Sequence, residues 1–153
     1  MGNRAVITRS TTDSAPCIYL HWNGGRDSVD GFLLVAKYMA FTNNASDDWD
    51  EFARFLSKNF FDYGGELGMT IYREKYGQAD ADNGDNGVYV VDGNWNIVNR
   101  LFTRRPEQNE HNRLHLAAHI LYRHLGLSKE DADKAGYEEL ADMGVEDFVR
   151  KAQ

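Results

Sequence analysis

Hydrophobic and polar positions change their period along this chain, and each change marks an expected element. Two short apolar runs, Ala5–Thr8 and Ile18–Trp22, predict strands separated by a Ser/Thr-rich loop. From about residue 28 to 41 the apolar side chains recur at i, i+3 and i+4, which predicts a helix with Asp27 as its N-cap. The first quarter of the chain therefore predicts two strands followed by a helix.

The middle of the chain predicts a second helix, a strand and a β-hairpin. The helix is expected to begin near Ser46 or Asp47, because an apolar stripe at helical spacing follows: Trp49, Phe52, Ala53, Leu56 and Phe60. Leu67–Arg73 predicts a strand. Asp92-Gly93-Asn94 lies between two apolar runs, and Asp-Gly tolerates the positive φ of a tight turn. We therefore expect a β-hairpin near residues 87–101.

The last third of the chain predicts helices. Pro106 suits the first turn of a helix that runs to about Leu125 and is closed by Gly126, with an expected buried stripe of Leu114, Ala117, Ala118, Leu121 and Leu125. A short helix and a final helix follow. Because strands and helices group rather than alternate, the predicted fold class is α+β, a single domain with a mixed or antiparallel sheet packed by helices. We expect an α+β core over 1–126 and an acidic helical segment over 127–153 that packs on the same domain.

Charge narrows the classes of partner. The 153 residues carry 24 acids against 17 Lys and Arg, for a formal net charge of -7. This balance disfavours general nucleic-acid binding and suits a partner with a basic surface. The candidate partner-binding residues are the clustered acids Asp47, Asp48, Asp50, Glu51, Glu138, Glu139, Asp142, Glu146 and Asp147.

Location is predicted from cysteine usage and from apolar runs. Cys17 is the only cysteine, so an intrachain disulfide is excluded and a reducing, cytoplasmic setting is expected. The chain contains no 18-residue apolar run and no apolar signal core at its start, so we expect neither a membrane span nor secretion.

Residues 18–28 read as a strand, a glycine hinge and the start of a helix, a geometry that can present backbone N–H groups to an anion. The candidate ligand-binding residues are His21, Asn23, Gly24, Gly25 and Arg26. The alternative is a plain turn. No Walker sequence and no G-x-G-x-x-G is present, and Asp27 and Asp30 would repel a phosphate.

Other chemical signals are weaker. His111, His115 and His119 recur every four residues, but His-Asn-Arg-Leu-His lacks the glutamate of H-E-x-x-H. We interpret them as a solvated polar face and predict no metal site. The acid-rich loop 80–87 does not fit an EF-hand and is expected to be a solvated turn.

The one concentrated basic patch, formed by Arg100, Arg104 and Arg105, could hold an acidic partner or a phosphate, or pair with the chain's own acids. No nucleophile motif is present, and Cys17 lies in an apolar strand. We therefore predict no catalytic residue and no cofactor, and we do not expect an enzyme.

The opening Met1-Gly2-Asn3-Arg4-Ala5-Val6-Ile7 and the segment Tyr19-Leu20-His21-Trp22-Asn23-Gly24-Gly25-Arg26-Asp27-Ser28-Val29 resemble a family of small phage, prophage and plasmid proteins. Asp85-Asn86-Gly87-Val88-Tyr89 resembles it too. The resemblance implies a mobile-element setting rather than a chemistry.

In that setting small acidic proteins often occupy a host machine. The leading hypothesis is therefore a non-catalytic inhibitor of a bacterial defence system, of the anti-CRISPR kind. The alternative is a small enzyme or ligand-binding protein that uses the Gly24-Gly25 turn as an anion or phosphate site. A structural or assembly protein is a third hypothesis, and the oligomeric state is left open.

Overall fold

The computed structural model describes residues 3–39, 41, 46–60, 69–72, 75–104 and 113–134. In chain order its elements are strands β1 (Ala5–Thr8) and β2 (Cys17–Leu20), helices α1 (Arg26–Tyr38) and α2 (Ser46–Phe60), strand β3 (Met69–Tyr72), the 3-10 turn η1 (Tyr76–Gln78), strands β4 (Val88–Val91) and β5 (Ile97–Leu101), and helix α3 (Arg113–His124). Residues 129–134 are also helical.

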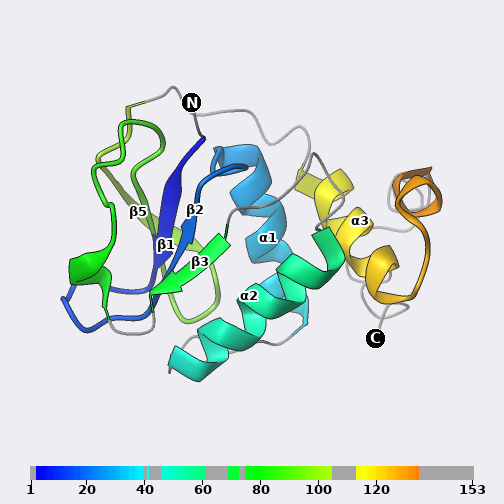
Figure 1. Ribbon diagram of the computed structural model, residues 1–153, viewed down its shortest axis with the longest axis horizontal. Coiled ribbons are helices and arrows are strands. Elements are labelled where there is room, and N and C mark those ends of the chain that lie inside the picture. The colour runs from blue at the N-terminus through cyan, green and yellow to red at the C-terminus, as the bar shows by residue number, and fades with distance from the viewer. Residues whose placement is uncertain are drawn as a thin grey trace.

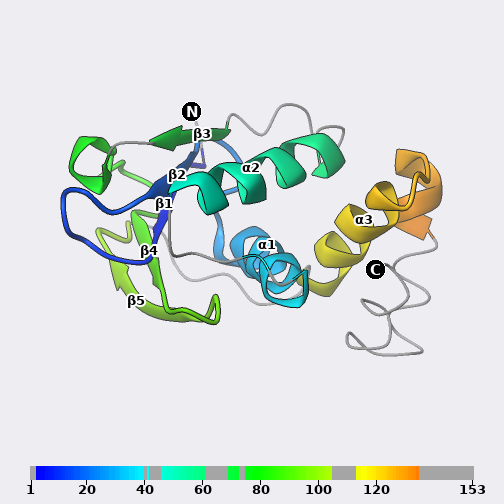
Figure 2. The same ribbon diagram turned by 90° about the horizontal axis from the view of Figure 1, so that it is seen from below.

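The strands form one mixed sheet in the order β3-β2-β1-β4-β5 (Figures 1 and 2). The central strand β1 runs antiparallel to β2, with Ala5 opposite Leu20, and parallel to β4, with Val6 opposite Val88. The two outer pairs, β2–β3 and β4–β5, are antiparallel. This arrangement confirms the predicted α+β class and selects the mixed sheet over a purely antiparallel one.

The α-helices α1, α2 and α3 lie on one side of the sheet. Helices α1 and α2 form the layer next to it, and α3 lies beyond them, packed against both (Figures 1 and 2). The main core lies between the sheet and these helices and takes side chains from both, including Ile7, Ile18, Phe32, Trp49 and Phe52. Residues 116–122 of α3 are buried without interruption, so this part of the helix is covered on every side rather than along one stripe.

The other face of the sheet carries a smaller apolar cluster of Val6, Cys17, Val88 and Val90. The segment 75–87 covers it with Tyr76, Ala79 and Ala81. The alternation of side chains along each strand explains the two clusters, because neighbouring residues such as Val6 and Ile7 point to opposite faces. Both faces of β1 are therefore buried.

The loop 80–87 is not the solvated turn that we expected. Asn83 and Asp85 are 3% and 5% exposed. The side-chain oxygen of Asn83 accepts from the amides of Asp85 and Gly87, and the Asp85 carboxylate accepts from the Arg4 Nε at 2.7 Å. Asn83 and Asp85 are buried because they bind the loop's own backbone and the start of β1, whereas Asp80 and Asp82 are exposed.

Two local predictions of helix and turn geometry were wrong in detail. Helix α1 begins two residues earlier than expected, with Gly25 as N-cap, and Asp27 lies in its first turn, where it accepts from the Ser28 amide at 2.9 Å. In the hairpin turn the left-handed residue is Trp95, with φ 63°, and not Gly93.

His119 does not belong to a solvated face. It is fully buried, its Nδ1 lies 2.6 Å from Oδ1 of Asp133, and its ring meets the ring of Phe60 edge to face. The expected polar interpretation is therefore wrong for His119, whereas His111 and the side chain of His115 lie outside the described residues. Leu125 follows the end of α3 and is exposed, not buried as expected.

Residues 127–134 pack on the same core as the rest of the chain. Ala132 is fully buried in the main cluster, and Leu127 packs against it. Together with the Asp133 contact to His119, this ties the segment to α3 and α2. The division at residue 126 stays a prediction, and the remainder of 127–153 lies outside the described residues.

Gly126 closes α3 as expected, with φ 96°, while the Leu127 amide donates to the Tyr122 carbonyl. We predict that Gly126→Ala lowers the free energy of unfolding by about 1 kcal/mol, because an L side chain is strained at this φ. Urea denaturation measures the change. Gly93→Ala is the matched control: neither position has an atom within 4 Å of an added Cβ, but Gly93 is not left-handed, so its variant should be neutral. Equal losses in both variants would contradict this explanation.

Candidate functional site

The Gly24-Gly25 turn is buried, and the backbone of Gly24 is hydrogen-bonded to other parts of the chain. The Gly24 amide donates to the Asn3 carbonyl at 2.8 Å, and its carbonyl accepts the Tyr89 hydroxyl at 2.8 Å. A Cβ on Gly24 would overlap the Asn3 carbonyl oxygen and lie 2.7 Å from the Ala5 Cβ. Glycine is therefore required here for a close approach, and the left-handed residue of the turn is Asn23, with φ 61°.

The other residues predicted for this turn do not converge on one point. The His21 Nδ1 lies 3.0 Å from the Tyr19 hydroxyl, and its ring meets the ring of Trp22. Burial raises the pKa of the Tyr19 phenol above its ordinary value. Arg26 is the first residue of α1, and its side chain pairs within that helix: its Nε lies 3.2 Å from the Asp30 carboxylate. The anion site at this turn stays a prediction.

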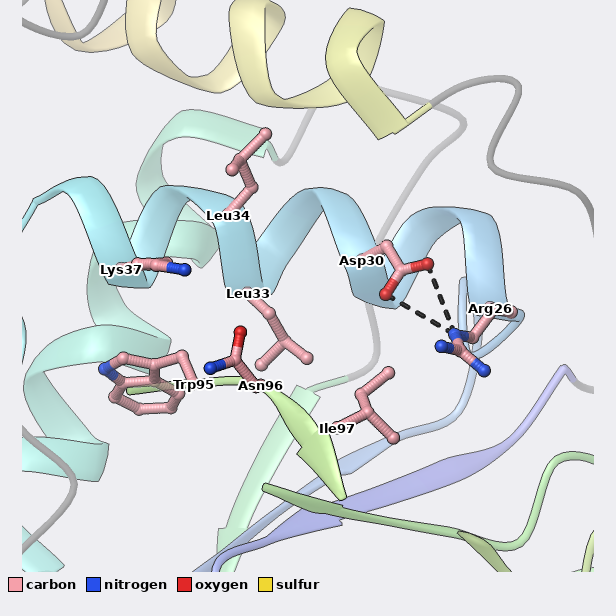
Figure 3. Close-up of a pocket in the computed structure, with 8 residues that line it drawn as sticks. All are labelled: Arg26, Asp30, Leu33, Leu34, Lys37, Trp95, Asn96 and Ile97. Atoms are coloured by element: carbon pink, nitrogen blue, oxygen red, sulfur yellow. Dashed lines mark hydrogen bonds and ion pairs between the residues drawn. The ribbon is translucent and has the colours of Figure 1, made fainter. Parts of the chain in front are cut away.

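A pocket of about 280 Å³ lies between α1 and the beginning of β5 (Figure 3). Helix α1 lines it with Arg26, Asp30, Leu33, Leu34 and Lys37, and the hairpin contributes Trp95, Asn96 and Ile97. Of these, only Arg26 was singled out from the sequence as a ligand-binding residue. The helical spacing of Arg26, Asp30 and Lys37 beside the apolar stripe was a signal for a polar face on α1, but nothing local to it indicated the hairpin.

Trp95 forms the inner wall of this pocket, and residues far from it in the sequence hold its side chain in place. Its indole N–H donates to the Phe41 carbonyl at 2.8 Å, and its ring lies 4.9 Å from the Phe52 ring and 5.2 Å from the Trp49 ring, centroid to centroid. A bulky residue at positive φ is strained by about 1–2 kcal/mol, and these contacts hold it in place.

The predicted partner-binding acids separate in the structure. Asp47 and Glu51 are exposed and Asp48 is half-buried, so these three lie at the outward N-terminal end of α2. Asp50 is only 7% exposed and lies 4.0 Å from Arg54 Nη2, so it is not part of an open acidic surface. Glu138, Glu139, Asp142, Glu146 and Asp147 lie outside the described residues.

The basic patch is engaged by the chain's own groups. Arg104 reaches the Asp82 carboxylate at 2.9 Å, which holds the pKa of its guanidinium above the ordinary value. Arg100 stacks over the Tyr89 ring at 3.7 Å and donates to the Asn86 carbonyl at 2.8 Å. Arg105 lies outside the described residues. We considered either an external acidic partner or pairing with the chain's own acids, and Arg104 pairs with an acid of the chain.

Neither a metal cluster nor a membrane span is found in the part of the chain that the structure describes. No three His, Cys, Asp or Glu residues are grouped there in a way that could hold a metal ion. No described helix has the length and apolar character needed to cross a bilayer.

Comparisons of this chain with protein-family models, with curated proteins and with solved structures gave no match. The resemblance of residues 1–7, 19–29 and 85–89 to phage, prophage and plasmid proteins therefore stays an expectation from the sequence.

The close approach at Gly24 makes a testable demand on the fold. We predict that Gly24→Ala lowers the free energy of unfolding by about 1–3 kcal/mol, because the new methyl group overlaps the Asn3 carbonyl and the Ala5 side chain. Tyr89→Phe removes only the hydroxyl that binds Gly24 and should lower it by about 1 kcal/mol. Chemical denaturation followed by circular dichroism measures both. A Gly24→Ala protein as stable as the parent would show that the turn has room for a side chain.

Asp92 gives the hairpin a predictable pH dependence. The backbone amides of Asn96 and Asn94 both donate to the Asp92 carboxylate. These bonds, the one from Asn96 most strongly, hold the pKa of Asp92 below its ordinary value. This contribution is complete above the unfolded pKa of about 3.9 and is lost as pH falls through the lower folded pKa.

Asp92→Asn keeps a side-chain oxygen but does not titrate. The stability difference between the parent and Asp92→Asn should therefore be constant from pH 7 to about pH 5 and should shrink below about pH 4. Urea denaturation at a series of pH values measures it. A difference that does not change with pH would contradict this role.

Proposed function

We propose that this protein is a mobile-element accessory protein that binds a host macromolecular machine without catalysis. The concrete form of the proposal is an inhibitor of a bacterial defence system, of the anti-CRISPR kind. The mobile-element setting comes from the resemblance of residues 1–7 and 19–29 to phage, prophage and plasmid proteins. The observation that supports binding to a basic surface is the arrangement of charges on α2.

The outward face of α2 is divided by charge. Exposed acids occupy its N-terminal half, at Asp47 and Glu51, and exposed bases occupy its C-terminal half, at Arg54 and Lys58. These positions follow i, i+4, i+7 and i+11, so they form one stripe roughly 16 Å long. The opposite side of α2 is anchored in the core through Trp49, Phe52 and Leu56.

A divided stripe of this kind favours one orientation of a partner. A basic patch on the partner would meet Asp47, Asp48 and Glu51, and the bases at the far end of α2 would repel it if it shifted along the helix. Complementary charge of this kind mainly raises the association rate and makes binding sensitive to salt. The acidic C-terminal segment, residues 127–153, also contributes to the formal net charge of -7.

The small-molecule alternative at the Gly24-Gly25 turn receives less support from the geometry. The amide and the carbonyl of Gly24 both serve the fold, and the Ser28 amide binds the Asp27 carboxylate. For this reason the acidic surface, and not the turn, carries the proposal.

Phage infection tests the proposed inhibition directly. We predict that expression of this chain in bacteria with an active CRISPR–Cas system raises the plaquing efficiency of a targeted phage. The double variant Asp47→Lys with Glu51→Lys should lose most of this protection, because it reverses the charge at the acidic end of α2. Binding of the parent to the purified defence complex should weaken as salt rises from low to physiological concentration.

The matched control makes the same charge change elsewhere. Asp13→Lys with Asp80→Lys alters two exposed acids away from α2 and should leave protection unchanged. Equal loss in both double variants would show that only net charge matters. Absence of protection against every system in a panel of CRISPR–Cas types would reject the anti-CRISPR form of the proposal.

A further inference from the structure

The pocket between α1 and the hairpin combines an apolar base with a small excess of positive charge. Leu33 and Ile97 supply the apolar surface, and in Figure 3 they lie between the two charged ends. Arg26 and Asp30 form an ion pair at one end, while Lys37 and Asn96 lie toward the other. With one acid and two bases, the lining carries a net charge of +1 in a chain whose formal charge is -7.

The two ends of the pocket differ in what they offer a ligand. Asp30 offsets the charge of Arg26, because the Asp30 carboxylate lies 3.2 Å from the Arg26 Nε. Lys37 is exposed in the last turn of α1, and the side-chain amide of Asn96 lies on the facing wall. An ammonium group and an amide N–H group are both donors suited to a carboxylate.

The neighbouring Asp92 is bound mainly by the turn itself, and the charge of Lys37 also helps to lower its pKa. Its Oδ1 accepts from the amides of Asn94 and Asn96 at 2.9 and 3.0 Å, and its Oδ2 lies 3.5 Å from the Asn96 side-chain nitrogen. These bonds direct the carboxylate toward the loop backbone. Asp92 thus fixes the position of Asn96 beside the pocket.

A second, independent observation comes from the backbone at the inner wall. Trp95 has φ 63° although its side chain is bulky, and such strain persists only where surrounding contacts enforce it. Its indole bond to the Phe41 carbonyl and its packing on Trp49 and Phe52 hold the hairpin turn against the helices. The strained residue therefore sets the width of the space between Asn96 and α1.

We propose that this pocket binds a small organic carboxylate with an apolar body. The carboxylate lies between Lys37 and the amide of Asn96, and the body covers Leu33 and Ile97 up to the Arg26–Asp30 pair. The volume of about 280 Å³ is just below the range of about 300–1,000 Å³ that is usual for drug-sized ligands, so a metabolite-sized molecule fits. A dianion such as phosphate fits less well, because Asp30 repels it and the apolar base offers it nothing.

Matched probes test the proposal on the full chain. We expect 4-phenylbutyrate, titrated into ¹⁵N-labelled protein, to give saturable NMR shifts at the Trp95 indole and at the Asn96 side-chain amide. The corresponding alcohol, 4-phenylbutan-1-ol, should bind more weakly, and 4-phenylbutylamine and inorganic phosphate should give no saturable shifts at these two groups. Lys37→Gln should weaken the binding of 4-phenylbutyrate roughly tenfold, because it removes the charged partner of the carboxylate.

Lys58→Gln is the matched control, since Lys58 is also exposed in the last turn of a helix but lies outside the pocket. It should bind the probe as the parent does. Equal weakening by both variants would show general charge attraction, and equal binding of the acid and the alcohol would show an apolar crevice without a carboxylate site. Either result, or the absence of saturable shifts with 4-phenylbutyrate, overturns the proposal. None of these results depends on whether the protein inhibits a defence system.

Discussion

Tyr89 donates its hydroxyl hydrogen to the carbonyl of Gly24, and the Gly24 amide donates to the carbonyl of Asn3, so one glycine joins the turn before α1 to β4 and to the residues that lead into β1. The contact is possible because Gly24 has no side chain, since the Asn3 carbonyl oxygen and the Ala5 side chain fill the space that a Cβ would need. The start of α1 is thereby fixed against β1 and β4. The layer of α1 and α2, the position of α3 and the wall of the pocket all depend on this placement (Figures 1 and 3).

The sequence predicted best what is decided within a few residues. Gly126 ends α3 because its φ and the capping bonds are local, and the hairpin lies where Asp92-Gly93-Asn94 indicated. The same turn shows the limit of local reasoning. Asp92 builds it through the amides of Asn94 and Asn96, and the left-handed position falls on Trp95. The indole bond to Phe41, 54 residues away, was not predictable from the turn sequence.

His119 and Asp85 illustrate a second limit, which is the burial of polar groups. Both belong to segments that we expected to be solvated, and both are buried because a partner distant in sequence meets them. Asp133 binds His119 from the segment after α3, and Arg4 binds Asp85 from the start of β1. A buried polar group costs little free energy when it is hydrogen-bonded, so composition alone cannot distinguish such a group from a solvated one.

The two candidate sites differ in the same way: one is formed by neighbouring residues of a single helix, and the other by residues far apart in the sequence. The acids at the start of α2 are recognised by their clustering around the beginning of its apolar stripe, but the burial of Asp50 is not, because about 100° per residue places it only about 60° from the exposed Asp47. The acidic end of α2 could therefore be located from the sequence. The pocket could not, because its walls are brought together only by the sheet: Lys37 belongs to α1, and Asn96 belongs to a turn whose position is set by Trp95 and Phe41. The surface proposed for a macromolecular partner is thus determined by one helix, whereas the pocket proposed for a small carboxylate exists only in the complete fold.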